Sequence, residues 1–248
     1  MTVRNDKEVA ILRKGGSTLA QILDAVVAAV KPGVTTETLD RIAADEMRAA
    51  NVKPAFLGYH GYPAVLCTSV NTKVVHGIPS SAEILQEGDV LGLDIGIQSQ
   101  GLFTDMAVTV GVGTISLEAE RLLAVTKKAL DIAIKAVRPG VTTGDIGALV
   151  QQYVEGERFG VVRDLVGHGV GRRLHEEPVL PNFGIPGRGT RIAEGMVLAF
   201  EPMVTAGDWH VQTLDDGWSV VTLDGSLTAH FEHTILVTKD GCDVVTKA

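Results

Sequence analysis

Gly88-Asp-Val-Leu-Gly-Leu-Asp94 reappears 107 residues later as Gly195-Met-Val-Leu-Ala-Phe-Glu201. Each segment carries an acidic residue in an apolar strand. A second pair keeps the same offset, because Val30-Lys-Pro-Gly-Val-Thr-Thr36 matches Val137-Arg-Pro-Gly-Val-Thr-Thr143. Two matches in one register argue against chance, so Asp94 and Glu201 are expected at equivalent positions in two halves of one fold. Two copies are too few for a solenoid, and a domain with a pseudo-two-fold internal repeat follows.

The sequence around these segments predicts helices first and strands afterwards in each half. Apolar residues at helical spacing predict helices over Lys7–Val30 and Glu118–Val137, which end at proline-glycine pairs. A threonine can then cap a second helix in each half. The candidate caps are Thr35 or Thr36 in the first half and Thr142 or Thr143 in the second. The second helices are expected over Glu37–Ala50 and Gly144–Gly156. Strands are expected over Val65–Val70, Val90–Ile97, Leu102–Val110, Met196–Glu201, Trp218–Thr222 and Ala229–Val237.

The pattern indicates an α+β protein in which helices cover an antiparallel sheet. Asp94 and Asp105 fit a hairpin with Gln98-Ser99-Gln100-Gly101 as its turn, which brings both carboxylates towards one face. No linker or low-complexity segment interrupts the chain. We therefore expect a single domain over residues 1–248, with halves of about 1–112 and 113–248.

Three carboxylates stand where they are costly, because Asp94, Glu201 and Glu232 lie in or beside apolar strands. An ionised carboxylate in such a place is unfavourable unless it is paired or binds a metal. Any one of them could be a salt-bridged acid of the core. Three in separate strands, with Asp105 eleven residues after Asp94, indicate a shared cation.

His168 is the candidate nitrogen ligand of this group. It stands in Gly167-His-Gly-Val-Gly171, where glycines let the backbone approach closely. An oxygen-rich set with one histidine suits cobalt, manganese, iron(II) or zinc. Paired ions about 3.5–4 Å apart need bridging carboxylates, which explains why four acids are present. The sequence thus predicts two divalent metal ions held by Asp94, Asp105, His168, Glu201 and Glu232.

Other histidines receive no role from spacing alone. His76 and His175 each lie in a short segment beside glycine or proline, where functional side chains collect, but each alone is more often a satisfied polar residue. Spacing also assigns nothing to His60, His210, His230 or His233. Cys67 is most simply a small apolar residue of the core.

Composition narrows the class of protein. A net charge of −8 over 248 residues provides no basic patch, so nucleic-acid binding has no electrostatic support. No apolar run has the length of a membrane span, and the first residues do not resemble a secretory signal. Two cysteines are too few for a disulfide framework. We expect a cytoplasmic protein without membrane association, and a monomer by default.

Several motifs together resemble the type I methionine aminopeptidases of the pita-bread fold, of bacterial type, over nearly the whole chain. The matching segments are Gly58-Tyr-His-Gly-Tyr-Pro63, Val75-His-Gly-Ile-Pro79, Leu93-Asp-Ile-Gly96, Thr104-Asp105, Gly167-His-Gly-Val-Gly171, His175-Glu-Glu-Pro178, Phe200-Glu-Pro-Met203 and Phe231-Glu-His-Thr234. This resemblance implies the same five metal ligands. It also implies a metal-dependent exopeptidase that removes the N-terminal methionine of nascent polypeptides when the second residue is small, with a metal-bridging water or hydroxide as nucleophile.

The resemblance further implies roles for individual side chains. Glu201 would accept the proton of the water, His175 would stabilise the oxyanion, and His76 would hydrogen-bond the peptide near the scissile amide. The methionine pocket would contain Tyr59, Tyr62, Cys67 and Trp218. Phe56 and Leu174 depart from the residues that relatives often have beside this pocket, which leaves the side-chain preference open. Any contact with the ribosome is expected to be transient.

Two alternatives share the fold. An X-Pro aminopeptidase or prolidase would use the same five ligands, but those enzymes usually carry a substantial extra N-terminal domain, whereas here the catalytic repeat begins almost at residue 1. A non-catalytic peptide-binding protein of the pita-bread fold would be expected to lose metal ligands, and this chain keeps all five together with His76 and His175.

Overall fold

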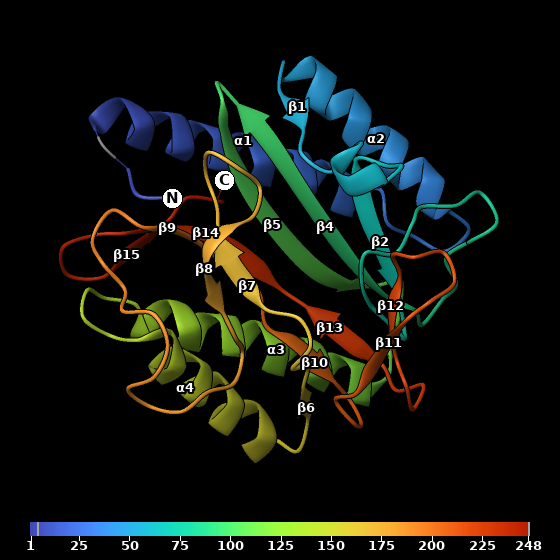
Figure 1. Ribbon diagram of the computed structural model, residues 1–248. Coiled ribbons are helices and arrows are strands. Elements are labelled where there is room, and N and C mark those ends of the chain that lie inside the picture. Colours follow the sequence, from blue (N-terminus) through green and yellow to red (C-terminus); the bar gives the residue numbers. More distant parts are fainter. Residues whose placement is uncertain (4, 248) are drawn as a thin grey trace.

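The computed structural model describes residues 1–3 and 5–247. Figure 1 shows two pairs of helices on opposite sides of a group of strands. The helices are α1 (Asp6–Ala28), α2 (Thr36–Ala49), α3 (Leu117–Ala136) and α4 (Thr143–Gly156), with a short 3-10 helix over Tyr59–Gly61. The strands are β1 (Lys53–Pro54), β2 (Leu66–Val70), β3 (Lys73–Val75), β4 (Val90–Ser99), β5 (Leu102–Gly111), β6 (Gly160–Val161), β7 (Gly167–Gly169), β8 (Glu176–Leu180), β9 (Val197–Phe200), β10 (Met203–Thr205), β11 (Val211–Thr213), β12 (Val220–Thr222), β13 (Thr228–His230), β14 (Glu232–Val237) and β15 (Cys242–Val244).

The largest sheet has nine strands, in the order β1-β4-β5-β14-β9-β7-β8, with β15 also paired to β14 and β2 also paired to β4. Two three-stranded sheets, β13-β10-β6 and β11-β12-β3, complete the strands of the described residues. Every pairing is antiparallel. The prediction of an α+β fold with an antiparallel sheet covered by helices is confirmed.

Threonine caps begin the second helix of each half. Thr35 accepts a hydrogen bond from the Thr38 amide at the start of α2, and Thr142 accepts one from the Asp145 amide at the start of α4. The Asp145 carboxylate in turn accepts a hydrogen bond from the Thr142 amide, which completes a capping box. These two caps lie 107 residues apart, as do the isolated bridges Thr35–Ile84 and Thr142–Arg191. The correspondence supports the interpretation of two related halves.

The main sheet buries one face against the helices. Leu91, Leu93 and Ile95 of β4 pack with side chains of α1 and α2, while Ile235 and Val237 of β14 pack with α3 and α4. Side chains alternate along a strand, so residues between these face the other way. The opposite face of β4 therefore carries Asp94, and the same alternation places Asp105 and Glu232 on that face.

Some predicted boundaries were wrong. The turn between β4 and β5 is the two-residue Gln100-Gly101, both with positive φ, rather than four residues. The strand expected over Ala229–Val237 is divided at Phe231, because β13 pairs with β10 whereas β14 pairs with β9 and β5. The strand expected from Trp218 begins only at Val220, since the Asp216 carboxylate accepts the amides of Trp218 and Ser219 in a turn.

Candidate metal centre and its pocket

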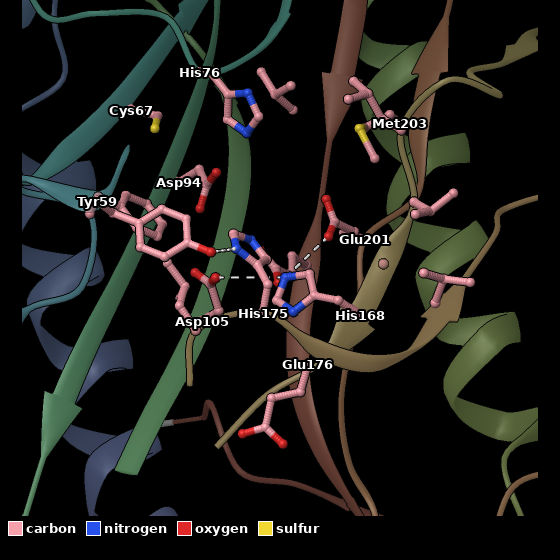
Figure 2. A pocket seen from close by; sticks show the side chains of 18 of the residues that line it. Tyr59, Cys67, His76, Asp94, Asp105, His168, His175, Glu176, Glu201 and Met203 are labelled. Carbon is pink, nitrogen blue, oxygen red and sulfur yellow. Dashed lines mark hydrogen bonds and ion pairs between the residues drawn. The ribbon is translucent and has the colours of Figure 1, made fainter. Parts of the chain in front are cut away.

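Five neighbouring strands bring the predicted ligands together. Asp94 lies in β4, Asp105 in β5, Glu232 at the start of β14, Glu201 directly after β9, and His168 in β7. These strands are consecutive in the sheet, although their order in the chain is different. All five residues line the same cavity, and Figure 2 shows the side chains of four of them gathered there: Asp94, Asp105, His168 and Glu201.

The distances within this cluster are short. One ligand atom each from Asp105, His168 and Glu232 lie within 4.8 Å of one another. The His168 Nε2 atom is 3.5 Å from Glu201 Oε1 and 4.0 Å from Asp105 Oδ2. Asp105 and Glu232 are 3% and 2% exposed, so water screens their charges poorly. Such a group of acids is unfavourable on its own and favourable around a cation.

The hydrogen-bonding pattern tests whether a metal fits. His168 Nδ1 lies 3.0 Å from the Gly169 carbonyl oxygen, to which it donates a hydrogen bond, so neutral His168 presents a lone pair at Nε2. That lone pair faces one oxygen each of Asp105 and Glu201, and a carboxylate in its ionised form can only accept. Among the described residues, Asp94 Oδ1 and Glu232 Oε1 are buried acceptors with no hydrogen-bond partner. A donor set made only of lone pairs fits a divalent cation, and the centre satisfies this test.

Electrostatics lead to the same conclusion. Burial raises the pKa of Asp94 to about 7. Burial, followed by the neighbouring negative charges, raises the pKa values of Asp105, Glu201 and Glu232 well above their ordinary range. Burial, followed by the charge of His175, lowers the pKa of His168 to about 3, which keeps its ring neutral. A bound cation would reverse the penalty on the carboxylates, because ligation requires them ionised.

Glycines on both sides of His168 let three strands approach closely. A Cβ atom at Gly167 would lie 2.5 Å from the Ala199 carbonyl oxygen of β9. At Gly169 it would lie 2.2 Å from the Glu177 carbonyl oxygen of β8. Any side chain at either position would push a neighbouring strand away. The expectation that these glycines permit close backbone approach is confirmed.

The five candidate metal ligands line part of a cavity of about 500 Å³. The substrate residues predicted from the resemblance all line it: Tyr59, Tyr62, Cys67, His76, His175 and Trp218. Phe56 and Leu174, the two departures from the family pattern, also line it and are 8% and 2% exposed. The Tyr62 hydroxyl donates to backbone carbonyls of Leu66 or Gly77, at 3.2 and 3.0 Å, which holds its ring in the wall. The cavity is thus mostly apolar beside a strongly acidic end.

Two further imidazoles border the cluster. His175 Nδ1 lies 2.8 Å from the Tyr59 hydroxyl, and its ring meets that of His168 edge to face at 4.2 Å between centroids. Burial, then the charges of His76 and His60, lowers the pKa of His175 to about 4. His76 is held with a positive φ of 59°, a conformation uncommon for a residue with a side chain, and burial lowers its pKa.

Comparison with known proteins places this site in a family. The model of metallopeptidase family M24 matches residues 10–239. The chain belongs to this family. It is 46% identical to the methionine aminopeptidase of Clostridium perfringens and 43% identical to methionine aminopeptidase 1 of Bacillus subtilis, over 98% of each chain in both cases. The crystal structure of methionine aminopeptidase from Thermotoga maritima superposes with a TM-score of 0.98 at 44% identity, over 100% of both chains.

More distant members of the metallopeptidase family show the shared fold alone. Prolidase from Pyrococcus furiosus superposes with a TM-score of 0.78 at 20% identity, and the match covers 66% of that protein.

In the described residues of the present M24 chain, no helix is long and apolar enough to cross a membrane.

Sequence reasoning missed several residues around this M24 site. The wall of the cavity includes three further apolar side chains, which only the packing of separate segments brings there: Val75, Leu165 and Met203. Glu176 lies 3.0 Å from the Met1 amino group and accepts the Arg173 amide; in Figure 2 its carboxylate points away from the candidate metal ligands. His230 lies 3.6 Å from Glu201. Its spacing of two from Glu232 gave no usable signal, because the chain passes from β13 to β14 between these two residues.

Proposed function

We propose that this M24 enzyme removes the N-terminal methionine from proteins whose second residue is small, by metal-assisted hydrolysis. The observation that carries the proposal is the junction of two environments: an apolar cavity that could take a methionine side chain ends at a cluster of lone-pair donors. The relatives named methionine aminopeptidases, at 40–46% identity over nearly the full chain, support the same activity.

The metal centre in this proposal comprises two divalent ions. Asp94, Asp105, His168, Glu201 and Glu232 would hold the ions, and Asp105 and Glu232 lie on the neighbouring strands β5 and β14. When bound, such ions lower the pKa of a water molecule and polarise a carbonyl oxygen. The donor set accepts cobalt, manganese, iron(II) or zinc.

Proton transfer is assigned to Glu201. Its carboxylate faces the cavity, and its backbone carbonyl oxygen accepts a hydrogen bond from Asn182 at 3.0 Å, which holds the residue at the end of β9. Glu201 would take a proton from the attacking water and pass it to the leaving amine.

Oxyanion stabilisation is assigned to His175. If the Tyr59 hydroxyl donates to Nδ1, neutral His175 carries its proton at Nε2, where it can donate to the developing oxyanion. Tyr59 would therefore select the useful tautomer. His76, on the opposite side of the cavity beside Trp218, would hydrogen-bond the peptide near the scissile amide.

The methionine side chain would occupy the apolar part of the cavity. Tyr62, Cys67 and Trp218 form one wall, and Phe56 and Leu174 pack in the same buried cluster. Bulky Phe56 also packs on the face of β4 that carries Asp94, since a Cβ at Gly96 would lie 2.9 Å from its ring. The proposed partner is the N-terminus of a nascent chain. In this proposal the enzyme is a cytoplasmic monomer, and its contact with the ribosome is transient.

An X-Pro peptidase is the second candidate, favoured only by the shared fold. A non-catalytic peptide-binding protein is the third. Peptide choice separates the three proposals. The enzyme proposed here cleaves a Met-Ala peptide, an X-Pro peptidase prefers Ala-Pro, and a binding protein cleaves neither.

The first experiment is hydrolysis of Met-Ala-Ser by chelated enzyme titrated with manganese, cobalt or iron(II). We expect metal-dependent release of free methionine. Glu201→Gln should lower kcat by about 10²–10⁴-fold, the range for a positioned general base. Glu194→Gln is the matched control, because Glu194 is exposed and outside the cavity. Absence of methionine release with every metal would refute the proposed activity.

A further inference from the structure

His230 has no place in the machinery described so far, yet it is fixed behind Glu201. It ends β13, where it pairs with Met203 of β10. The Thr109 hydroxyl binds both backbone groups of His230: it accepts the amide at 2.8 Å and donates to the carbonyl oxygen at 2.7 Å. The side chain is 4% exposed and does not line the cavity. Its position is therefore set by backbone contacts that do not depend on substrate.

The His230 Nε2 atom points at the carboxylate of Glu201. It is buried without a hydrogen-bond partner and lies 3.6 Å from Glu201 Oε2. This separation is slightly longer than that of a formed hydrogen bond. A buried polar atom without a partner is unfavourable, so a hydrogen bond between His230 Nε2 and Glu201 would be favoured.

Glu201 consequently lies between two imidazoles, one at each oxygen. His168 Nε2 is 3.5 Å from Oε1, but it presents a lone pair because Nδ1 donates to the Gly169 carbonyl oxygen. His230 is the imidazole of the two that can donate to Glu201. A donor at Oε2 leaves Oε1 directed towards His168 and the other ligands.

We propose that His230 is a positioning residue, which donates a hydrogen bond from Nε2 to Glu201 Oε2 and thereby orients Oε1 towards the metal ligands. The hydrogen bond is a feature of neutral His230. Its consequence for metal affinity is independent of substrate, whereas its consequence for turnover rests on the proposed function.

A pair of amide variants tests the reach of the donor. The side-chain amide nitrogen of glutamine can occupy the place of Nε2 of histidine, whereas that of asparagine reaches only the place of Nδ1. We expect His230→Gln to bind Mn²⁺ within about 3-fold of the parent, and His230→Asn to bind it about 10–100-fold more weakly, as for lost outer partners of metal ligands. Calorimetry on chelated protein measures both affinities without substrate.

Turnover of Met-Ala-Ser supplies the second readout. With saturating Mn²⁺, we expect His230→Asn to lower kcat about 10-fold or more while KM changes by less than about 3-fold, because the carboxylate is misplaced but the methionine pocket is not. His230→Gln should restore kcat. Loss in both variants alike would assign His230 to packing only, and unchanged Mn²⁺ affinity in His230→Asn would overturn the proposal.

His233, which is half-buried, provides a matched control at a second histidine. It lies in β14 next to Glu232, but its Nδ1 atom meets the Thr246 hydroxyl at 2.9 Å. His233→Gln and His233→Asn should not show the graded loss of Mn²⁺ affinity expected at position 230. If the parent protein fails to release methionine, the proposed function fails, yet the calorimetric comparison at position 230 still decides whether the hydrogen bond exists.

Discussion

Gly169→Ala tests how closely the sheet is packed around the nitrogen ligand. The new Cβ atom would lie 2.2 Å from the Glu177 carbonyl oxygen and 2.9 Å from that of Glu176. Carbon and oxygen atoms at optimal separation stand about 3.5 Å apart, so β7 and β8 must separate by about 1 Å. Both neighbours are backbone atoms of a paired strand, which cannot rotate away as a flexible side chain could.

The expected cost has two parts. Overpacking of this kind destabilises by about 1–3 kcal/mol. The displacement also moves His168, which precedes the substituted residue, and a misplacement of about 1 Å in an active site can lower kcat/KM about 10²-fold. We therefore expect denaturant unfolding of the chelated protein to show the stability loss, and calorimetry to show weaker Mn²⁺ binding.

Gly156→Ala is the matched control for this substitution. Gly156 ends α4, its Cβ would meet nothing within 4 Å, and its φ is not positive. Alanine there should leave stability unchanged or raise it by up to about 1 kcal/mol. If Gly169→Ala instead unfolds like the control and binds Mn²⁺ with parental affinity, the close contact between β7 and β8 is wrong and the argument from the glycines fails.

Further predictions concern pH, the His175 partner and the amino terminus. Because burial raises the pKa of Asp94 from 3.8 to about 7, folded chelated protein holds this proton more tightly than the unfolded chain does. The stability of the folded state that depends on protonated Asp94 is therefore fully present below pH 4 and is lost as the pH rises towards 7. The rise in melting temperature on adding Mn²⁺ should accordingly be larger at pH 7.5 than at pH 5, and the reverse order would contradict this. Tyr59→Phe removes the hydroxyl that selects the His175 tautomer, and should lower kcat/KM about 5–10-fold, the equivalent of about 1 kcal/mol, with parental Mn²⁺ affinity in calorimetry. Met1 is 6% exposed and its amine lies 3.0 Å from Glu176, so a folded preparation that carries Met1 should retain it during incubation with metal, as intact mass spectrometry can check.

Local signals in the sequence were enough to predict the helices of the fold. The four helices lie within two residues of their predicted ends, because apolar spacing and proline-glycine stops are local signals. For the helix caps, the sequence left two threonine candidates in each half, and the structure identifies Thr35 and Thr142 as the caps. Hydrophobic periodicity could not predict that the strand expected over Ala229–Val237 is divided at Phe231. An apolar run has the same pattern whether it stays in one sheet or passes between two.

The candidate site was predictable for the residues whose chemistry conflicts with their surroundings. A carboxylate in an apolar strand, such as Asp94, is visible without any structure. His230 was not, because a buried histidine is common and only the three-dimensional contact with Glu201 distinguishes it. Met203 likewise joins the cavity wall through the pairing of β10 with β13, and no local pattern encodes that contact.

The two halves differ in a way that explains how a symmetric fold supports an asymmetric site. Asp94 and Asp105 lie 11 residues apart on paired strands, whereas Glu201 and Glu232, beside the paired strands β9 and β14, lie 31 apart. The additional residues form β10 to β13, which bring Trp218 into the cavity and His230 behind Glu201. His168 has only a glycine at the equivalent position 107 residues earlier. The repeat thus supplies the carboxylates in pairs, while the nitrogen ligand and the insertion of the second half make Glu201 unlike Asp94.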